Sequence, residues 1–172
     1  MMSFHTMLDL ETLATSNNAF IISIGAVNFN EKEILNEFYA VINTNKPEAD
    51  FDVNPATVMW WMSQSQEARD ALKGGESSLS PHLHSFAKFV EGTNGVWGNS
   101  STFDNMILRN AYQKLNIKCP WHFRKDKCFR TLANMFPREA IIATGTQHNA
   151  LDDARKQALV VIALQNKHGF KL

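Results

Sequence analysis

The chain has 172 residues, of which 44% are hydrophobic and 20% are charged, a composition typical of one globular domain and not of a disordered segment. Lysine plus arginine equals aspartate plus glutamate, with 17 residues in each pair, so the formal net charge is zero. This balance argues against a protein that coats nucleic acid with a broad basic surface, but it allows an enzyme that holds a few nucleotides beside bound cations.

The sequence predicts neither secretion nor a membrane partner. Residues 1–13 lack the basic and apolar segments of a signal peptide, and no apolar run approaches the roughly 18 residues of a membrane span. Cys119 and Cys128 have no CxxC pair and no matching histidines, which favours two reduced thiols over a structural zinc site. We therefore expect a cytoplasmic protein with a single domain over residues 1–172.

The first part of the chain predicts three strands. Residues 4–10 are predicted to form the first strand. The long β-branched run at 19–29 predicts a second strand that is buried on both faces. A turn at 30–32 followed by residues 34–42 predicts a third strand, antiparallel to the second. The predicted sheet therefore begins with three antiparallel strands.

From about Pro55 the pattern becomes helical. The segment 55–72, which is followed by two glycines, predicts a helix, and 80–92 predicts another. After these, the chain predicts a short strand at 95–99, a helix from 101, one or two helical turns at 128–136 and a closing helix at 149–167. This order predicts an α/β fold with a mixed central sheet flanked by helices.

An acidic pair ends the first predicted strand. Asp9 and Glu11 lie two residues apart, so both side chains point to the same face of the strand. Two neighbouring carboxylates repel each other and lose hydration when partly buried, which is unfavourable unless a cation lies between them. Mg²⁺ prefers such oxygen ligands, although an exposed acidic pair at a strand end is the alternative.

Asp104 follows the predicted strand at 95–99, at the kind of strand–loop–helix junction where open α/β sheets place their sites. The segment Ser101-Thr102-Phe103-Asp104 also matches a capping box, in which the acid accepts a hydrogen bond from the backbone N–H of the cap residue. The local sequence therefore leaves a metal-binding role and a capping role open for Asp104.

The last predicted helix offers a histidine and two aspartates. Asn149 is a good N-cap, which makes Asp152 the capping or dipole-favoured acid and leaves Asp153 available to face a cleft. His148 precedes the helix, and the ordinary histidine pKa of about 6.5 suits a base near neutral pH, although a plain surface position is the alternative. The apolar stripe of this helix consists of Leu151, Ala154, Ala158, Val161 and Ile162.

In this order, the fragments LDLETL, NSSTFDN and HNALDDARKQA resemble the histidine-containing branch of the DnaQ-like 3′–5′ exonuclease superfamily. Within it, the chain is most similar to small phage-encoded exonuclease A and the RNase T-like exoribonucleases, and the likeness covers most of the chain. The resemblance implies a ribonuclease H-like fold. It also implies two Mg²⁺ or Mn²⁺ ions held by Asp9, Glu11, Asp104 and Asp153, with His148 as the general base.

The activity implied by the resemblance is hydrolysis of single-stranded nucleic acid from the 3′ end to nucleoside 5′-monophosphates, with DNA slightly favoured over RNA. Three alternatives stay open: an exoribonuclease that processes RNA 3′ ends, a ribonuclease H-like endonuclease or strand-transfer enzyme, and a non-catalytic nucleic-acid-binding adaptor. The setting implied is the cytoplasm of a bacterial or phage-infected cell. A homodimer is one expected assembly, because the relatives include dimers.

Aromatic and apolar residues near the acids predict how the substrate end is held. Phe103, which is next to Asp104, is suited to stack on a nucleic-acid base. Trp60 and Trp61 point about 100° apart on a helix, so one is expected to pack and the other, which we predict to be Trp61, to contact substrate, with a helix–helix seam as the alternative for both. The resemblance places three residues beneath the terminal nucleotide: Leu10, Thr12 and Leu13. Three arginines are candidates for phosphate contact or for ordinary solvated positions: Arg109, Arg124 and Arg130.

Overall fold

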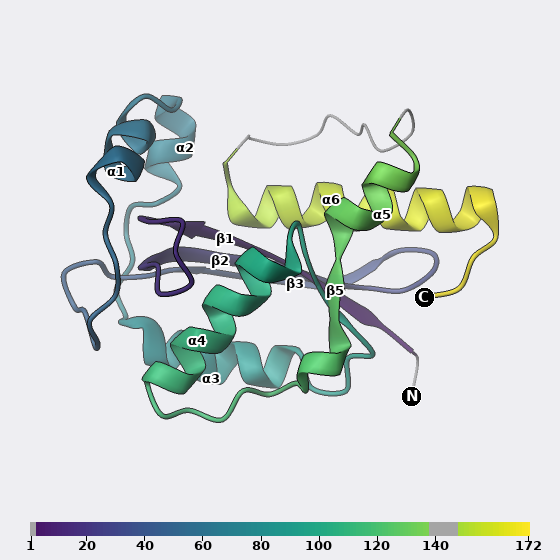
Figure 1. The fold of residues 1–172 in the computed structure, drawn as a ribbon, viewed down its shortest axis with the longest axis horizontal. Coiled ribbons are helices and arrows are strands. Elements are labelled where there is room, and N and C mark those ends of the chain that lie inside the picture. The colour runs from purple at the N-terminus through teal and green to yellow at the C-terminus, as the bar shows by residue number, and fades with distance from the viewer. Residues whose placement is uncertain (1–2, 138–147) are drawn as a thin grey trace.

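A five-stranded sheet in the order β3-β2-β1-β4-β5 forms the centre of the computed structural model, which describes residues 3–137 and 148–172 (Figure 1). β1 pairs antiparallel with β2 and β2 with β3, whereas β4 lies parallel to β1 and β5 parallel to β4. The predicted mixed sheet with three leading antiparallel strands is therefore confirmed. The strands are β1 (His5–Thr12), β2 (Ile21–Phe29), β3 (Ile34–Val41), β4 (Val96–Gly98) and β5 (Asp126–Cys128).

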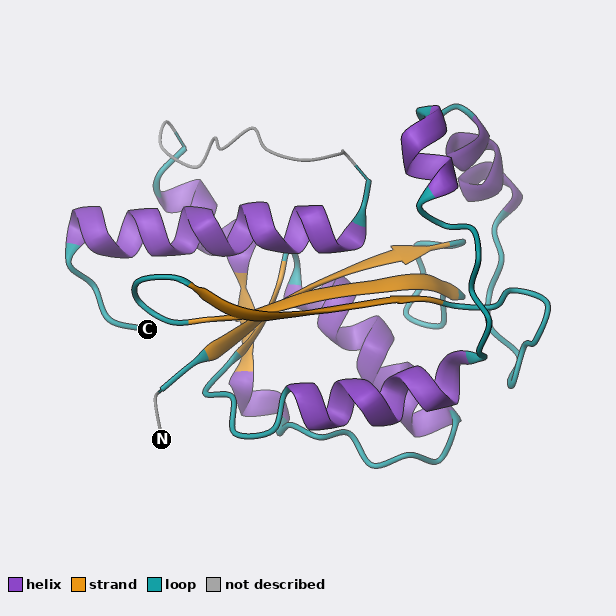
Figure 2. Ribbon diagram, turned by 180° about the vertical axis from the view of Figure 1, so that it is seen from behind, coloured by secondary structure: helices purple, strands orange, loops and turns teal. Residues whose placement is uncertain are grey.

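Helices cover both faces of this sheet. The long C-terminal helix α6 lies along one face and α3 lies along the other, while α1 and α2 stand together beyond one end of the strands (Figures 1 and 2). Within the described ranges, no helix is long and apolar enough to cross a membrane. The helices are α1 (Pro55–Met62), α2 (Gln66–Asp70), α3 (Leu79–Phe89), α4 (Met106–Lys114), α5 (Phe129–Met135) and α6 (Ala150–His168), with a π-helical turn η1 (Ser101–Asn105) and a 3-10 turn η2 (Phe123–Lys125).

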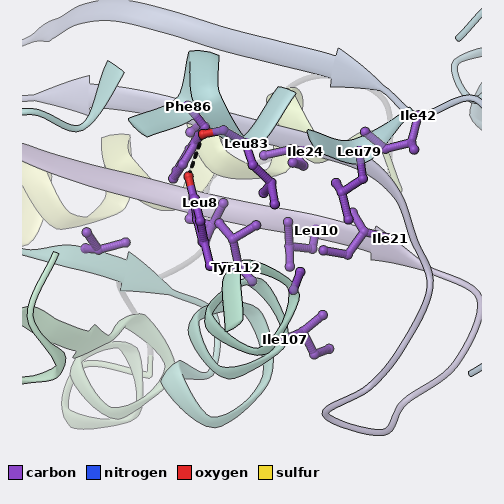
Figure 3. Close-up of a cluster of buried hydrophobic side chains, with 14 of the residues drawn as sticks. Leu8, Leu10, Ile21, Ile24, Ile42, Leu79, Leu83, Phe86, Ile107 and Tyr112 are labelled. Atoms are coloured by element: carbon purple, nitrogen blue, oxygen red, sulfur yellow. Dashed lines mark hydrogen bonds between the residues drawn. The ribbon is translucent and has the colours of Figure 1, made fainter. Parts of the chain in front are cut away.

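The two faces of the sheet carry separate apolar cores because side chains alternate along each strand. Leu8 and Leu10 of β1 pack with α3 and α4, whereas Met7 packs with the apolar stripe of α6. Figure 3 shows the first core, in which the Tyr112 hydroxyl donates a 2.7 Å hydrogen bond to the Leu83 carbonyl. β2 is buried along its whole length, as its unbroken apolar run predicts.

Two details of the predicted elements were wrong. The single helix expected over 55–72 is interrupted after Met62, because Ser65 starts a new helix by accepting a hydrogen bond from the Ala68 N–H. The strand β5 was not predicted, because three residues of polar sequence, DKC, carry no alternating apolar pattern. The edge strand β5 pairs with β4 immediately before α5 begins.

Two glycines allow helical segments to approach the sheet closely. A Cβ on Gly25 of β2 would lie 2.1 Å from the backbone carbonyl carbon of Ala150 at the start of α6. A Cβ on Gly98 of β4 would lie 2.9 Å from the Asp104 Cβ in η1. In the strand register, Gly25 pairs with Asp9. Because Gly25 and Gly98 have no side chain, η1 and the start of α6 can lie close to the sheet, beside the part of β1 that carries the acidic pair.

Candidate active site

The acids and the histidine of the three sequence fragments line a single cleft of about 430 Å³. Three chain segments that are distant in sequence supply them: β1 provides two acids, η1 provides one, and the start of α6 provides the fourth acid with the histidine before it. The residues brought together are Asp9, Glu11, Asp104, His148 and Asp153. Other lining residues include Leu10, Asn99, Ser100, Phe103, Arg130, Lys156 and Gln157.

Three of the carboxylates are buried with only 9%, 8% and 2% of their surface exposed, in the order Asp9, Glu11 and Asp104. Burial raises the pKa of Asp9 well above its usual range, and the charges of the neighbouring acids add to this effect. Burial, then the charges of Asp153 and Asp104, raises the pKa of Glu11 to about 8. Burial also raises the pKa of Asp104 to about 6, although backbone hydrogen bonds oppose that shift. Clustered carboxylates that resist ionisation fit a site for divalent cations, which would neutralise them.

Asp104 joins β1 to η1 through its two carboxylate oxygens. Oδ1 accepts a hydrogen bond from the Leu10 N–H at 3.2 Å, and Oδ2 accepts one from the Ser100 N–H at 3.4 Å. The donor at the cap is Ser100 and not the predicted Ser101, because the turn is π-helical and therefore wider. Capping and a place in the cleft are thus compatible roles for one side chain.

The start of α6 separates the two neighbouring aspartates as predicted. Asn149 caps the helix, since its Oδ1 accepts hydrogen bonds from the N–H groups of Leu151 and Asp152, both at 3.1 Å. Asp152 forms an ion pair with Arg155 at 2.7 Å and does not line the cleft. Asp153, one residue further on, faces the cleft.

Asp153 also holds the backbone of His148. Its Oδ2 accepts a 3.1 Å hydrogen bond from the His148 N–H, while its Oδ1 accepts one from the Lys156 Nζ at 2.8 Å. His148 has a φ of 60°, in the left-handed region that residues other than glycine rarely adopt. A ring nitrogen of His148 and one oxygen each of Glu11 and Asp153 lie within 4.8 Å of one another, close enough to share a cation or a water molecule.

A more apolar hollow adjoins the cleft and shares Leu10, Glu11 and Phe103 with it. The remaining lining comes mainly from α1 and from the end of β1. Leu13 does not line the hollow, because it packs against the cluster of Phe20, Ile22, Trp61 and Ala68. Of the predicted substrate contacts, those that line the hollow are Leu10, Thr12, Phe103 and Trp61.

The two tryptophans of α1 occupy different environments. Trp61 is 6% exposed, and its indole N–H donates a 2.9 Å hydrogen bond to the Thr12 carbonyl. Trp60 is 43% exposed, and its ring centroid lies 4.8 Å from that of His148 in an edge-on arrangement. Packing is therefore the clear role of Trp61, whose substrate contact stays a prediction, and Trp60 is the ring that projects beside the histidine.

Sequence reasoning missed four residues of the cleft: Asn99 and Ser100, which precede η1, and Lys156 and Gln157 of α6. The Gln157 Nε2 donates a 2.9 Å hydrogen bond to Asp9 Oδ1, which links α6 to β1. The positions of Lys156 and Gln157, three and four residues after Asp153 on one helix, were the available sequence signal for these two, because such residues share a helix face. Among the three candidate arginines, Arg130 lines the cleft, whereas Arg109 forms a 2.8 Å ion pair with Asp126.

The mixed five-stranded sheet, flanked by helices, and the buried carboxylates beside β1 define an α/β domain with an acidic cleft at the sheet. The family model described as the 3′-5′ exoribonuclease Rv2179c-like domain matches residues 4–165, and the chain belongs to this family. The predicted membership of the DnaQ-like 3′–5′ exonuclease superfamily is confirmed. No curated protein sequence matches the chain.

Several solved exonuclease structures share the fold. E. coli exonuclease I in complex with a dT13 oligonucleotide has a TM-score of 0.70 and 15% identity, and the match covers 98% of this chain but only 42% of that one. The nuclease domain of 3′hExo, a DEDDh family member bound to rAMP, has a TM-score of 0.68 and 15% identity over 96% and 92% of the two chains. Exonuclease X in complex with 5′ overhanging duplex DNA has a TM-score of 0.61 and 16% identity over 96% and 93%. At such identities the likeness concerns the fold, and the ribonuclease H-like prediction is confirmed.

Proposed function

We propose that residues 1–172 form one metal-dependent 3′–5′ exonuclease domain that hydrolyses single-stranded nucleic acid from its 3′ end to nucleoside 5′-monophosphates. The observation that carries this proposal is the convergence of four acids and one histidine, from three distant segments, on a single cleft. The exonuclease family to which the chain belongs supports the same reaction.

The four carboxylates suit two Mg²⁺ or Mn²⁺ ions, because hard divalent cations prefer oxygen ligands. When bound, such ions would lower the pKa of a coordinated water and provide positive charge beside the departing 3′ oxygen. Asp9, Glu11, Asp104 and Asp153 would hold them. The hydrogen bonds that fix Asp104 and Asp153 keep their carboxylates facing the cleft in advance of binding.

His148 is the proposed general base. One of its ring nitrogens lies within 4.8 Å of oxygens of Glu11 and Asp153, so a water molecule held between these groups is within reach of the imidazole. The Asp153 carboxylate fixes the backbone of His148, and the Trp60 ring lies against the imidazole. A nitrogen base suits this position because Mg²⁺ and Mn²⁺ leave imidazole uncoordinated more readily than Zn²⁺ does.

The hollow beside the cleft is the proposed site for the terminal nucleoside. Phe103 and Trp60 line it, and stacking of a base on an aromatic ring contributes about 1–3 kcal/mol. The family description favours RNA, so RNA 3′ ends are the first substrate to test and the DNA preferred from sequence is the second. A cytoplasmic location is also proposed, and a homodimer is the assembly to test by light scattering.

Digestion of 5′-labelled RNA and DNA of one sequence, each single-stranded and duplex, tests the proposal. With Mg²⁺ or Mn²⁺ we expect stepwise shortening from the 3′ end, faster for single strands, and complete loss of shortening with chelator or in Asp104→Asn. Internal fragments would instead indicate a ribonuclease H-like endonuclease. Binding without shortening would indicate a non-catalytic adaptor.

A further inference from the structure

Gln157 of α6 is a buried amide that meets the acidic cleft. Its side chain lies one helical turn after Asp153 and is 7% exposed. Its Nε2 donates a 2.9 Å hydrogen bond to Asp9 Oδ1. Its Oε1 has no hydrogen-bond partner within the described part of the chain, although the residue lines the cleft.

The neighbouring carboxylates determine the orientation of the Gln157 amide and leave its oxygen without a hydrogen-bond donor. With a divalent cation bound the acids of the cleft are ionised, and an ionised carboxylate only accepts hydrogen bonds, so the amide N–H then faces Asp9 and the amide oxygen faces away from it. In that state the other carboxylates of the cleft, Glu11 and Asp104 among them, also only accept and cannot satisfy this oxygen. A buried acceptor without a partner is unfavourable, so the geometry calls for a hydrogen-bond donor that arrives with a ligand.

We infer that Gln157 is a positioning residue of the metal site. Its amide N–H fixes the orientation of Asp9, and its Oε1 accepts a hydrogen bond from a water in the hydration shell of a divalent cation. This inference rests on the proposed function, because it requires a cation among the carboxylates. Partners of this kind orient the residues that bind a metal, and their loss typically weakens metal affinity roughly 10- to 100-fold.

The same helix offers a matched control. Gln165 lies two turns further along α6, is 4% exposed, and also has an Oε1 without a hydrogen-bond partner among the described residues. Gln165 does not line the cleft. Replacing either glutamine with methionine keeps a similar volume and removes the amide, so a general effect of losing a buried amide would appear equally in both variants.

The test measures Mn²⁺ binding without nucleic acid, by electron paramagnetic resonance, in the wild type, Gln157→Met and Gln165→Met. We expect Gln157→Met to weaken Mn²⁺ binding roughly 10- to 100-fold and to lower kcat with little change in KM. Gln165→Met should bind Mn²⁺ as the wild type does. Gln157→Asn, whose side chain is one methylene too short to reach Asp9, should repeat the loss and serves if the methionine variant does not fold.

Two outcomes separate this inference from the proposed function. If the wild type binds Mn²⁺ and both Gln157 variants bind it equally tightly, the positioning role is overturned even if their melting temperatures in EDTA fall. If the wild type itself binds no Mn²⁺, the proposed metal-dependent function fails. Equal weakening in Gln157→Met and Gln165→Met would show a general effect of α6 packing and would also overturn the positioning role.

Discussion

Replacing Glu11 with glutamine is expected to stabilise the metal-free protein while it removes a proposed metal ligand. Burial, followed by the charges of Asp153 and Asp104, raises the pKa of Glu11 from 4.5 to about 8. The folded chain therefore holds this proton more tightly than the unfolded chain does. The stability contributed by the protonated form is fully present below pH 4.5 and is lost as the pH rises through about 8.

The magnitude follows from the two pKa values. At pH 7 the unfolded chain has ionised Glu11, whereas the folded chain keeps most of it protonated. From pH 4.5 to pH 7 is an interval of about 2.5 pH units, and each unit lowers the free energy of unfolding by about 1.4 kcal/mol. At pH 7 the wild type is therefore less stable by about 3 kcal/mol because of Glu11. Glutamine cannot ionise and has nearly the same volume, so about 3 kcal/mol is the ceiling for the gain. Sharing of protons with Asp9 and Asp104 reduces it.

Urea unfolding in EDTA between pH 4.5 and 8, followed by tryptophan fluorescence, measures this effect. The wild type should lose stability as the pH rises, by up to about 1.4 kcal/mol per pH unit from this group, and Glu11→Gln should show a shallower decline. Glu91→Gln, at an exposed position, serves as the control for a charge change away from the cleft. Added Mn²⁺ should stabilise the wild type more than Glu11→Gln. Parallel pH dependence of the wild type and Glu11→Gln would refute the reasoning.

Three further substitutions test the site. Asp9→Ala should abolish hydrolysis and keep the fold, because it removes a proposed ligand and relieves carboxylate repulsion; full activity in Mg²⁺ would show that the assignment is wrong. His148→Ala should slow single-turnover cleavage roughly 10²- to 10⁴-fold, and unchanged turnover from about pH 6 to 9 would remove His148 from the mechanism. Gly25→Ala places a Cβ 2.1 Å from the Ala150 backbone, so α6 must move and both melting temperature and activity should fall; wild-type values for both would contradict the close contact.

The convergence of the candidate residues on one cleft could be predicted because these residues lie where regular structure dictates their direction. The two-residue spacing of Asp9 and Glu11 places them on one strand face, and an Asn149 cap separates Asp152 from Asp153 at the start of a helix. Gln157 escaped prediction because a polar residue on a helix is usually solvated, and its burial depends on how closely α6 approaches β1.

One local cap and two tertiary contacts decided the features of the fold that the sequence analysis did not predict. The pattern of residues 55–72 is apolar enough for one helix, but Ser65 competes for the backbone and begins a second helix. The adjacent Trp60 and Trp61 carry the same apolar signal, and the buried ring is distinguished from the exposed one by its hydrogen bond to the Thr12 carbonyl and by its packing in an apolar cluster. The residues of β5 form a strand because they pair with β4, and their own sequence carries no strand pattern.

The identity of the first product released tests the central claim most directly. A single-stranded oligonucleotide labelled uniformly is incubated with Mn²⁺ and the wild type or Asp104→Asn, and the earliest products are separated by chromatography. We predict nucleoside 5′-monophosphates from the first time point with the wild type and none with Asp104→Asn. Short internal fragments or nucleoside 3′-monophosphates from the wild type would contradict the claim.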